Sequence, residues 1–486
     1  MAAYDTVIRG GTVVTASDMV RADIGIVGGR IAALGEKLDK GAHEIDAGGR
    51  LVMPGGVDSH CHIEQPGSTG GTNADTFTSG SISAACGGTT TTISFSPQVR
   101  GRGVREAMDG YAALARKSVI DYCFHIIVND PSDTVIEEEL PELIAEGHRS
   151  IKVFMTYPSN RMDDAQLLKV FACAKKHGAF VCVHAENHDA IMWMTDRLLE
   201  AGLTSPRYHA WSKPPVVERE AVHRVIALAE MLDLPIQVFH VTCEEAAEEI
   251  RRAQARGIKV FGETCPQYLT LTAEDMDRDG FEGAKFICSP APRTEADHAE
   301  IWRALTDGTL GIVSSDHAPY SFDDPRGKAL HGANARFSEI PNGVPGLETR
   351  LPLVFSEGVA AGRIGPCEFV ALTSANPARL FGLYPKKGTL AVGSDADIAI
   401  WDPEREVTIR SEDLHTLTDY TPYEGMSVTG WPVMTLSRGE VIWNDGEVTA
   451  EAGRGRWLKR EPYDFIRPTG RFTAPFDPIA LRKLEE

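Results

Sequence analysis

Residues 150–186, SIKVFMTYPSNRMDDAQLLKVFACAKKHGAFVCVHAE, contain two short apolar runs separated by a longer stretch. The runs SIKVFM and AFVCVHAE are continuous, which is typical of strands buried on both faces of a parallel sheet. Between them, DDAQLLKVFACAKKHG has apolar residues at helical spacing. The segment therefore predicts one strand–helix–strand unit.

The same pattern extends through the middle of the chain. Stretches with helical spacing separate most of the runs, and one of them, CEEAAEEIRRAQARG (243–257), ends in the Gly expected beyond a helix C-terminus. The eight apolar runs are RLVMPGGVDSH (50–60), TTTTISFS (89–96), DYCFHIIV (121–128), SIKVFM (150–155), AFVCVHAE (179–186), PIQVFHVT (235–242), KVFGETCP (259–266) and GIVSSDHAP (311–319). Eight parallel βα units close most naturally into a TIM barrel, and a doubly wound sheet is the alternative.

Both ends of the chain have a different pattern. Short alternating segments such as TVIRGGTVV (6–14) and VTGWPVMTLSRGEVIW (428–443) are joined by Gly and Asp turns, which indicates small twisted strands. The expected fold class is therefore α/β, a TIM (β/α)8 barrel with a smaller discontinuous β-sandwich built from both chain ends. The predicted domains are residues 1–53 and 385–455 for the two parts of the sandwich, 54–384 for the catalytic barrel, and 456–486 for a C-terminal arm that contacts a neighbouring subunit.

Composition excludes several classes of protein. With 69 acidic against 49 basic residues the net charge is -20, which repels nucleic-acid phosphates and anionic membranes. The start of the chain lacks a basic region followed by an apolar stretch, and no window approaches the roughly 20 apolar residues that span a bilayer. The nine cysteines contain no CxxC pair and are expected to be reduced core residues. We expect a cytoplasmic protein without nucleic-acid or membrane partners.

The strongest local signal for chemistry is DSHCH (58–62), at the end of the first barrel run. Residues two apart on a strand point to the same side, so His60 and His62 can present two imidazoles to one metal ion. An HxH alone is weak evidence, but later runs also end in ligand-type side chains, and the carboxyl ends of barrel strands meet at one rim. The further candidates are His184, His240 and Asp316. Nitrogen and oxygen ligands of this kind suit Zn²⁺ and other divalent first-row metals.

Lys152, in the fourth run, is the unusual candidate, because a lysine with an ordinary pKa of about 10.4 is a cation that repels a metal. It is either a solvated or ion-paired lysine, or a deprotonated amine that has added CO₂ to form a carbamate. The two oxygens of a carbamate could bridge two metals.

The chain resembles the dihydropyrimidinases and hydantoinases of the amidohydrolase superfamily. The resemblance covers nearly the whole chain, and the ordered set of motifs is more specific than any one of them. These motifs are VMPGGVDSHCHIE (52–64), SIKVFMTYP (150–158), VHAEN (183–187), FHVTCEEA (239–246), FGETCPQYLTL (261–271), SSDHAPY (314–320), IPNGVPGLE (340–348) and SANPARLFGLYPKKG (374–388).

The resemblance implies two Zn²⁺ per subunit, bridged by carboxylated Lys152 and by hydroxide. It implies His60, His62, Lys152 and Asp316 on one zinc, and Lys152, His184 and His240 on the other. Such a pair lowers the pKa of a shared water towards about 7, and Asp316 is expected to carry its proton to the departing ring nitrogen. A small-molecule cyclic amide substrate and a homotetramer are also implied.

Three further residues match substrate-binding positions of the family. Tyr157 matches a tyrosine that hydrogen-bonds the oxyanion, although it could merely pack on the barrel rim. Ser289 and Asn342 match positions that hold the cyclic amide through main-chain groups. His188, His317 and His331 match no ligand position and are expected to lie beside the site or at the surface.

Some residues depart from the family pattern. Gln65 stands where an apolar residue is usual, and residues 158–160 replace a Lys-Gly stretch, which leaves the ring substituent open. Glu64 occupies the place of a substrate-binding arginine of dihydroorotases, and its charge argues against a carboxylate substrate. An allantoinase, a hydrolase of linear amides and a non-catalytic scaffold relative that has lost its metal ligands are the remaining alternatives.

Overall fold

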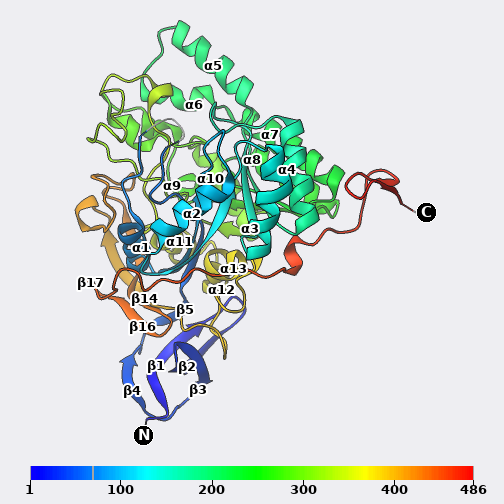
Figure 1. Cartoon of the computed structure of the whole chain (residues 1–486). Coiled ribbons are helices and arrows are strands. Elements are labelled where there is room, and N and C mark those ends of the chain that lie inside the picture. Colours follow the sequence, from blue (N-terminus) through cyan, green and yellow to red (C-terminus); the bar gives the residue numbers. More distant parts are fainter. Residues whose placement is uncertain (1, 68–70, 485–486) are drawn as a thin grey trace.

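Two large sheets dominate the computed structural model, which describes residues 2–67 and 71–484 (Figure 1). One is an eight-stranded sheet, and each of its strands falls within one of the eight apolar runs except β6, which extends one residue beyond the first run. Its strands are β6 (Gly56–Cys61), β7 (Thr89–Ser96), β8 (Asp121–Ile127), β9 (Ser150–Phe154), β10 (Phe180–His184), β11 (Ile236–Val238), β12 (Val260–Thr264) and β13 (Ile312–Val313).

The eight strands follow one another in sequence order, and every pair is parallel. The two outer strands meet just beyond β13, where His317 forms a parallel bridge with Cys61 of β6. The backbone N–H of His62 donates to the carbonyl of His317 at 2.6 Å. These contacts close the sheet, so the predicted TIM barrel is confirmed.

Strand alternation decides which side chains enter the barrel. On β9, Ile151 and Val153 belong to the core that packs against the helices, so the side chain of Lys152 between them points into the barrel. A register shift in β6 separates Val57, which faces the interior, from Cys61, which faces the outer core. His60 and His62 flank Cys61 and therefore both face inward.

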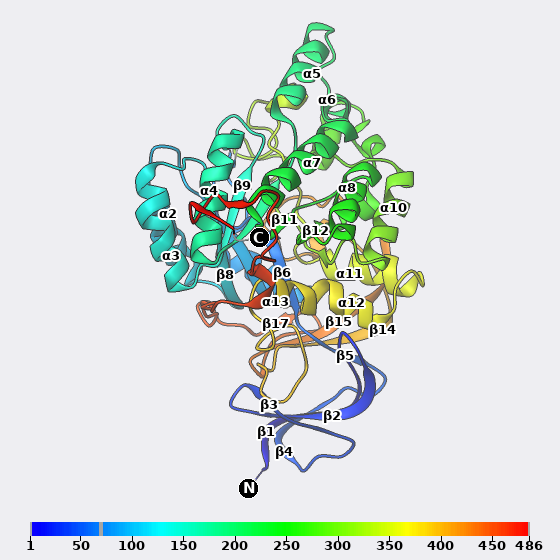
Figure 2. The same cartoon turned by 90° about the vertical axis from the view of Figure 1, so that its right-hand side faces the viewer.

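Helices cover the outside of the barrel (Figure 2). The predicted helix after β9 is confirmed as α4 (Asp164–His177), which begins at a capping box made by Asp163 and Gln166. Gly178 ends it with a φ of 74°, a conformation that favours glycine. The remaining α-helices are α1 (Phe77–Cys86), α2 (Val104–Ala115), α3 (Leu140–Glu146), α5 (His188–Glu200), α6 (His209–Ser212), α7 (Pro215–Leu232), α8 (Glu244–Ala255), α9 (Gln267–Thr270), α10 (Glu295–Thr306), α11 (Arg350–Val354), α12 (Pro366–Val370) and α13 (Asn376–Leu380).

The second sheet has nine strands from both chain ends and lies below the barrel in Figure 1. Its central contact is β5 (Leu51–Pro54), which pairs with a strand from each end. The others are β1 (Tyr4–Val14), β2 (Met19–Val27), β3 (Arg30–Gly35), β4 (Gly41–Asp46), β14 (Ile398–Thr408), β15 (Ser427–Ser437), β16 (Glu440–Asn444) and β17 (Glu447–Val448). The smaller domain is discontinuous, as predicted.

The first apolar run is divided between the two sheets. Gly55 N donates to the carbonyl of Asp397 beside β14, whereas Gly56 N donates to the carbonyl of Gly88 beside β7. A Cβ on Gly55 would meet the side chain of Thr90. The chain thus passes from the second sheet into the barrel where only glycine fits.

A buried charge cluster joins the two sheets. Lys387 Nζ lies 2.7 Å from Asp121 at the start of β8, 2.6 Å from Asp397 and 3.0 Å from Asp395. All four side chains are buried. The ammonium group, together with the Arg438 guanidinium that contacts Asp121, neutralises part of this carboxylate cluster in a medium of low dielectric constant.

We expect Lys387→Met to lower the free energy of unfolding by about 3–5 kcal/mol, because the change removes the buried cation shared by three carboxylates and leaves only Arg438 beside Asp121. Chemical denaturation followed by tryptophan fluorescence measures the loss. The matched control is Lys386→Met at the neighbouring exposed position, for which we expect no comparable change. Equal stability of both variants would contradict this role.

The start of the predicted C-terminal arm packs on the barrel of its own chain. Leu458 N donates to the carbonyl of Tyr122, and the buried Arg460 donates to Ser150 Oγ at 2.8 Å and to the Phe124 carbonyl at 2.7 Å. Further on, β18 (Phe476–Asp477) pairs with β19 (Arg482–Lys483), and the last two residues of the arm lie outside the described residues. Within residues 2–67 and 71–484, none of the helices has the length and apolar character that crossing a membrane requires.

Candidate metal centre and active site

All nine residues predicted for the site line one cavity of about 420 Å³ at the carboxyl ends of the barrel strands. A cavity of this size is within the usual range for small-molecule sites. These residues are His60, His62, Lys152, Tyr157, His184, His240, Ser289, Asp316 and Asn342.

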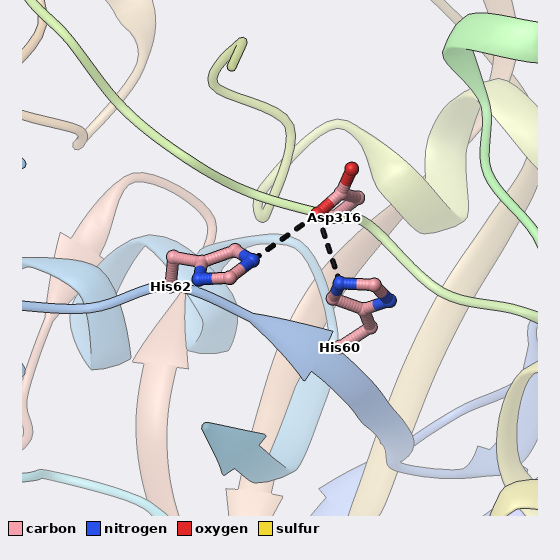
Figure 3. Close-up of side chains that lie close together, drawn as sticks. All are labelled: His60, His62 and Asp316. Carbon is pink, nitrogen blue, oxygen red and sulfur yellow. Dashed lines mark ion pairs between the residues drawn. The ribbon is translucent and has the colours of Figure 1, made fainter. Parts of the chain in front are cut away.

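Three of them converge on one point (Figure 3). Asp316 Oδ1 lies 3.0 Å from His60 Nε2 and 3.4 Å from His62 Nε2. One ligand atom of each residue lies within 4.8 Å of the others, which is compatible with binding a single ion. Burial lowers the pKa of His62 to about 4, so its imidazole is neutral and has a lone pair for a metal.

Buried carboxylates orient two of the histidines. His60 Nδ1 lies 2.7 Å from Glu263 Oε1, and His184 Nε2 lies 2.7 Å from Glu186 Oε2. A carboxylate can only accept, so these ring nitrogens carry the protons. With a cation in place of the proton between His60 and Asp316, His60 Nε2 and His184 Nδ1 would be the lone-pair nitrogens, an arrangement typical of metal-ligating histidines.

His240 and Lys152 have polar atoms that are left for a ligand. Both ring nitrogens of His240 are buried without a hydrogen-bond partner among the described residues. Lys152 Nζ lies over the rings of Phe154 at 4.8 Å and Phe239 at 4.2 Å, and burial lowers its pKa to about 8. The neutral amine needed for carbamate formation is therefore accessible near neutral pH. The donor set fits a pair of divalent cations.

The backbone is strained at three of these positions. Tyr157, His240 and Asp316 have φ values of 69°, 41° and 45°, in the left-handed region that non-glycine residues seldom adopt. Strained residues persist where the surrounding structure fixes them, and they cluster at functional sites. The strain therefore supports a functional role for the barrel rim.

The remaining predicted residues surround the histidines. The Tyr157 ring lies 5.2 Å from that of His184, and burial raises the pKa of its phenol, which keeps the hydroxyl as a donor. Ser289 Oγ donates to Glu186 Oε2 at 2.7 Å. Asn342 Oδ1 is buried and has no partner within the part of the chain that the structure describes.

The neighbouring residues have structural roles. Glu64 accepts from Phe77 N at 2.9 Å and from Lys117 Nζ at 3.2 Å, and it is not among the residues that line the cavity. A carboxylate substrate in this cavity would not meet the Glu64 side chain, so the predicted repulsion is not supported. His317 is buried, and its Nε2 lies 3.1 Å from Asp75 Oδ2. His331 is exposed. These positions agree with the expectation that neither histidine is a metal ligand.

A second group that could hold a metal, Cys86, Glu348 and His415, has a simpler explanation. Both oxygens of Glu348 already have partners, because His415 N and Ser83 Oγ lie against Oε2 and His415 Nδ1 lies 3.0 Å from Oε1. These contacts account for the cluster as a structural pair of the buried Glu348 and the partly exposed His415.

Sequence reasoning missed Glu263 and Glu186. Glu263 belongs to the seventh run, and Glu186 lies two residues beyond His184, so both have the strand-end placement used to select the other ligands. Their contacts with His60 and His184 depend on side-chain orientation. Strand-end position was therefore the only available signal.

Comparisons with known proteins identify the family and structures of similar fold. Residues 51–442 match the sequence model of the amidohydrolase family. A D-hydantoinase of Ralstonia pickettii is 47% identical over 463 residues, which cover 94% of this chain and 99% of that relative. A D-phenylhydantoinase of Escherichia coli (strain K12 / DH10B) is 41% identical over 463 residues, which cover 94% and 98%. The crystal structure of a dihydropyrimidinase from Brevibacillus agri NCHU1002 has a TM-score of 0.92 at 42% identity and covers 94% of this chain and 99% of its own. The predicted resemblance is confirmed.

Proposed function

Because the chain belongs to the amidohydrolase family, we propose that it hydrolyses the ring amide of hydantoins or dihydropyrimidines. The observation that carries the proposal is the convergence of six ligand-type side chains on one cavity of this chain. Its relatives include proteins whose names denote cyclic-amide hydrolases. The same observation argues against a scaffold protein, because none of the six positions has lost its ligand type.

We infer that His60, His62, Lys152 and Asp316 hold one Zn²⁺, and that Lys152, His184 and His240 hold another. Lys152 would contribute to both zinc positions as a carbamate. The carbamate forms when the neutral amine adds CO₂ and releases a proton. Bound there, the two cations would supply a water molecule of lowered pKa and polarise the ring carbonyl.

Asp316 is suited to move the proton. Its carboxylate lies at the centre of the site, with Oδ1 3.0 Å from His60 Nε2. It would accept a proton from the attacking water and deliver it to the ring nitrogen as the carbon–nitrogen bond breaks. The nitrogen then leaves as a neutral amide of the opened ring rather than as a poor anion.

Tyr157 is suited to stabilise the negative charge that develops on the carbonyl oxygen. Its phenol is protonated, lines the cavity and is fixed by a strained backbone. Ser289 and Asn342 line the same cavity and would hold the ring amide through main-chain groups. The catalytic and ring-binding groups would therefore act on the same amide.

We expect Tyr157→Phe to lower kcat by about 10²–10³-fold, because one oxyanion donor is lost and the ring remains in place. Steady-state kinetics with hydantoin measure the change, and KM should move much less than kcat. Unchanged kcat would show that Tyr157 only packs on the rim.

The proposed function is tested by a substrate panel of hydantoin, a 5-substituted hydantoin, dihydrouracil, allantoin and an N-acyl amino acid. We expect ring opening of hydantoins or dihydrouracil, followed by the appearance of the carbamoyl product. Turnover of allantoin alone would instead indicate an allantoinase, and turnover of only the open-chain amide would contradict the proposal. We also infer a homotetramer from the family resemblance, and sedimentation of the purified protein measures the subunit number.

A further inference from the structure

Gln65 lies beside the candidate ligand His62, in the loop that follows β6. We propose that Gln65 is a positioning residue that fixes the tautomer of His62 and so determines how strongly this position binds metal. The proposal rests on the metal centre of the proposed function, but it concerns metal affinity rather than the identity of the substrate.

The two ring nitrogens of His62 face different partners. Nε2 lies 3.4 Å from Asp316 Oδ1, and Nδ1 forms a hydrogen bond with the side-chain amide of Gln65. Nε2 can bind a metal only if it is unprotonated, and a neutral imidazole then carries its proton on Nδ1. That proton needs an acceptor, and the amide of Gln65 is the partner in contact.

Either end of the Gln65 amide can occupy this contact. Its nitrogen Nε2 is the atom that lies against His62 Nδ1, and a half-turn of the carboxamide would bring Oε1 to the same place. Oε1 is buried and has no other hydrogen-bond partner among the described residues, so the half-turn breaks none of its hydrogen bonds. Gln65 Oε1 can therefore accept a hydrogen bond from Nδ1–H whenever His62 binds a metal.

The backbone around Gln65 is held in place. Tyr111 Oη donates to the carbonyl of Ile63 at 2.6 Å, Glu64 N donates to the backbone carbonyl of Asp75 at 3.0 Å, and Asn73 N donates to the carbonyl of Gln65 at 3.1 Å. The Gln65 residue is 7% exposed. A fixed backbone and a buried side chain limit the freedom of the amide, which suits a residue that orients a ligand.

A stacking contact also limits the rotation of the His62 ring. It stacks on Phe95, with ring centroids 4.6 Å apart and an interplanar angle of 24°. The remaining freedom is the choice of which nitrogen carries the proton, and the contacts that act on it are Asp316 at Nε2 and Gln65 at Nδ1.

Gln65 differs from the partners of the other histidines in its charge. His60 and His184 contact the carboxylates of Glu263 and Glu186, whereas His62 contacts a neutral amide. A neutral acceptor orients the ring but raises its basicity less than a carboxylate does. The requirement at this position is therefore an acceptor, and glutamate should satisfy it as well as glutamine.

The experiment measures Zn²⁺ affinity of the apo-protein by chelator competition, with bicarbonate present, for the parent, Gln65→Met and Gln65→Glu. Methionine keeps the volume and removes the acceptor, and glutamate keeps the acceptor. We expect Gln65→Met to weaken the affinity of one site by about 10–100-fold and Gln65→Glu to stay within about threefold of the parent. The visible absorption of the Co²⁺ protein should change in the methionine variant, since the geometry at His62 is altered.

The matched control is Gln267→Met. Gln267 is 1% exposed, is not among the residues that line the cavity, and its amide has no partner in residues 2–67 and 71–484. The Zn²⁺ affinity of the Gln267→Met variant should equal that of the parent. The proposal is overturned if Gln65→Met binds Zn²⁺ within about threefold of the parent, or if Gln65→Glu loses as much affinity as Gln65→Met. A parent that binds Zn²⁺ tightly but opens no cyclic amide would contradict the proposed function and leave the affinity comparison decisive for Gln65.

Discussion

Lys152→Ala should lower hydantoin hydrolysis by at least about a thousandfold, the scale of loss seen when a catalytic unit is dismantled. The side chain is buried inside the barrel, and its amine lies between aromatic rings beside the histidines. As the proposed bridging carbamate it belongs to both metal positions, so its removal should also lower the bound metal. Metal analysis and kcat/KM of the same preparation measure both effects.

Two further variants sharpen this test. Lys152→Arg keeps a positive charge but cannot form the carbamate, because the guanidinium stays protonated, and it should be as inactive as the alanine variant. Lys176→Ala removes an exposed lysine of α4 and should behave as the parent. Full metal content and activity in Lys152→Ala would show that the lysine is an ordinary core residue.

Asp316→Asn should lower kcat by about 10²–10⁴-fold, the range expected for loss of a general acid and base. Asparagine keeps the shape and one oxygen, but it cannot take up the proton that the departing ring nitrogen requires. Because the carboxylate also lies against His60 and His62, some loss of metal affinity should accompany the loss of rate. The measurement is kcat for hydantoin at saturating Zn²⁺, which separates the two effects.

Asp196→Asn is the control for this change, since Asp196 is exposed on α5, does not line the cavity and has no predicted role. Its kcat should equal that of the parent. An Asp316→Asn variant that retains the parent kcat at saturating Zn²⁺ would mean that another group transfers the proton.

The barrel could be predicted because its strands are buried on both faces and therefore appear as continuous apolar runs. The division of the first run at Gly55 could not, because LVMP and GVDSHC follow each other with only Gly55 between them, and their strands are distinguished by the partners with which they pair. One of these partners is β14, about 350 residues away in the sequence, a separation that no local pattern encodes. Nor do local signals show that Thr90 requires a glycine there.

The placement of the ligands could be predicted from strand ends, since the carboxyl ends of parallel strands share one rim. Their orientation could not be. Glu263 and Glu186 determine which nitrogen of His60 and His184 is free, and these contacts depend on rotamers. The departure at Gln65 was visible in the sequence, but its contact with His62 appears only in the folded chain. The left-handed backbone of Tyr157, His240 and Asp316 is likewise a property of the fold.

The most direct test of the account is to titrate the metal-depleted protein with Zn²⁺ in the presence of bicarbonate and to follow hydantoin hydrolysis in the same samples. We predict negligible activity at the start and a rise to a plateau at about two Zn²⁺ per chain, as for two-metal hydrolytic sites. Full hydrolysis of hydantoin by the metal-depleted protein, or saturation with Zn²⁺ without any gain in hydrolysis, would contradict the account.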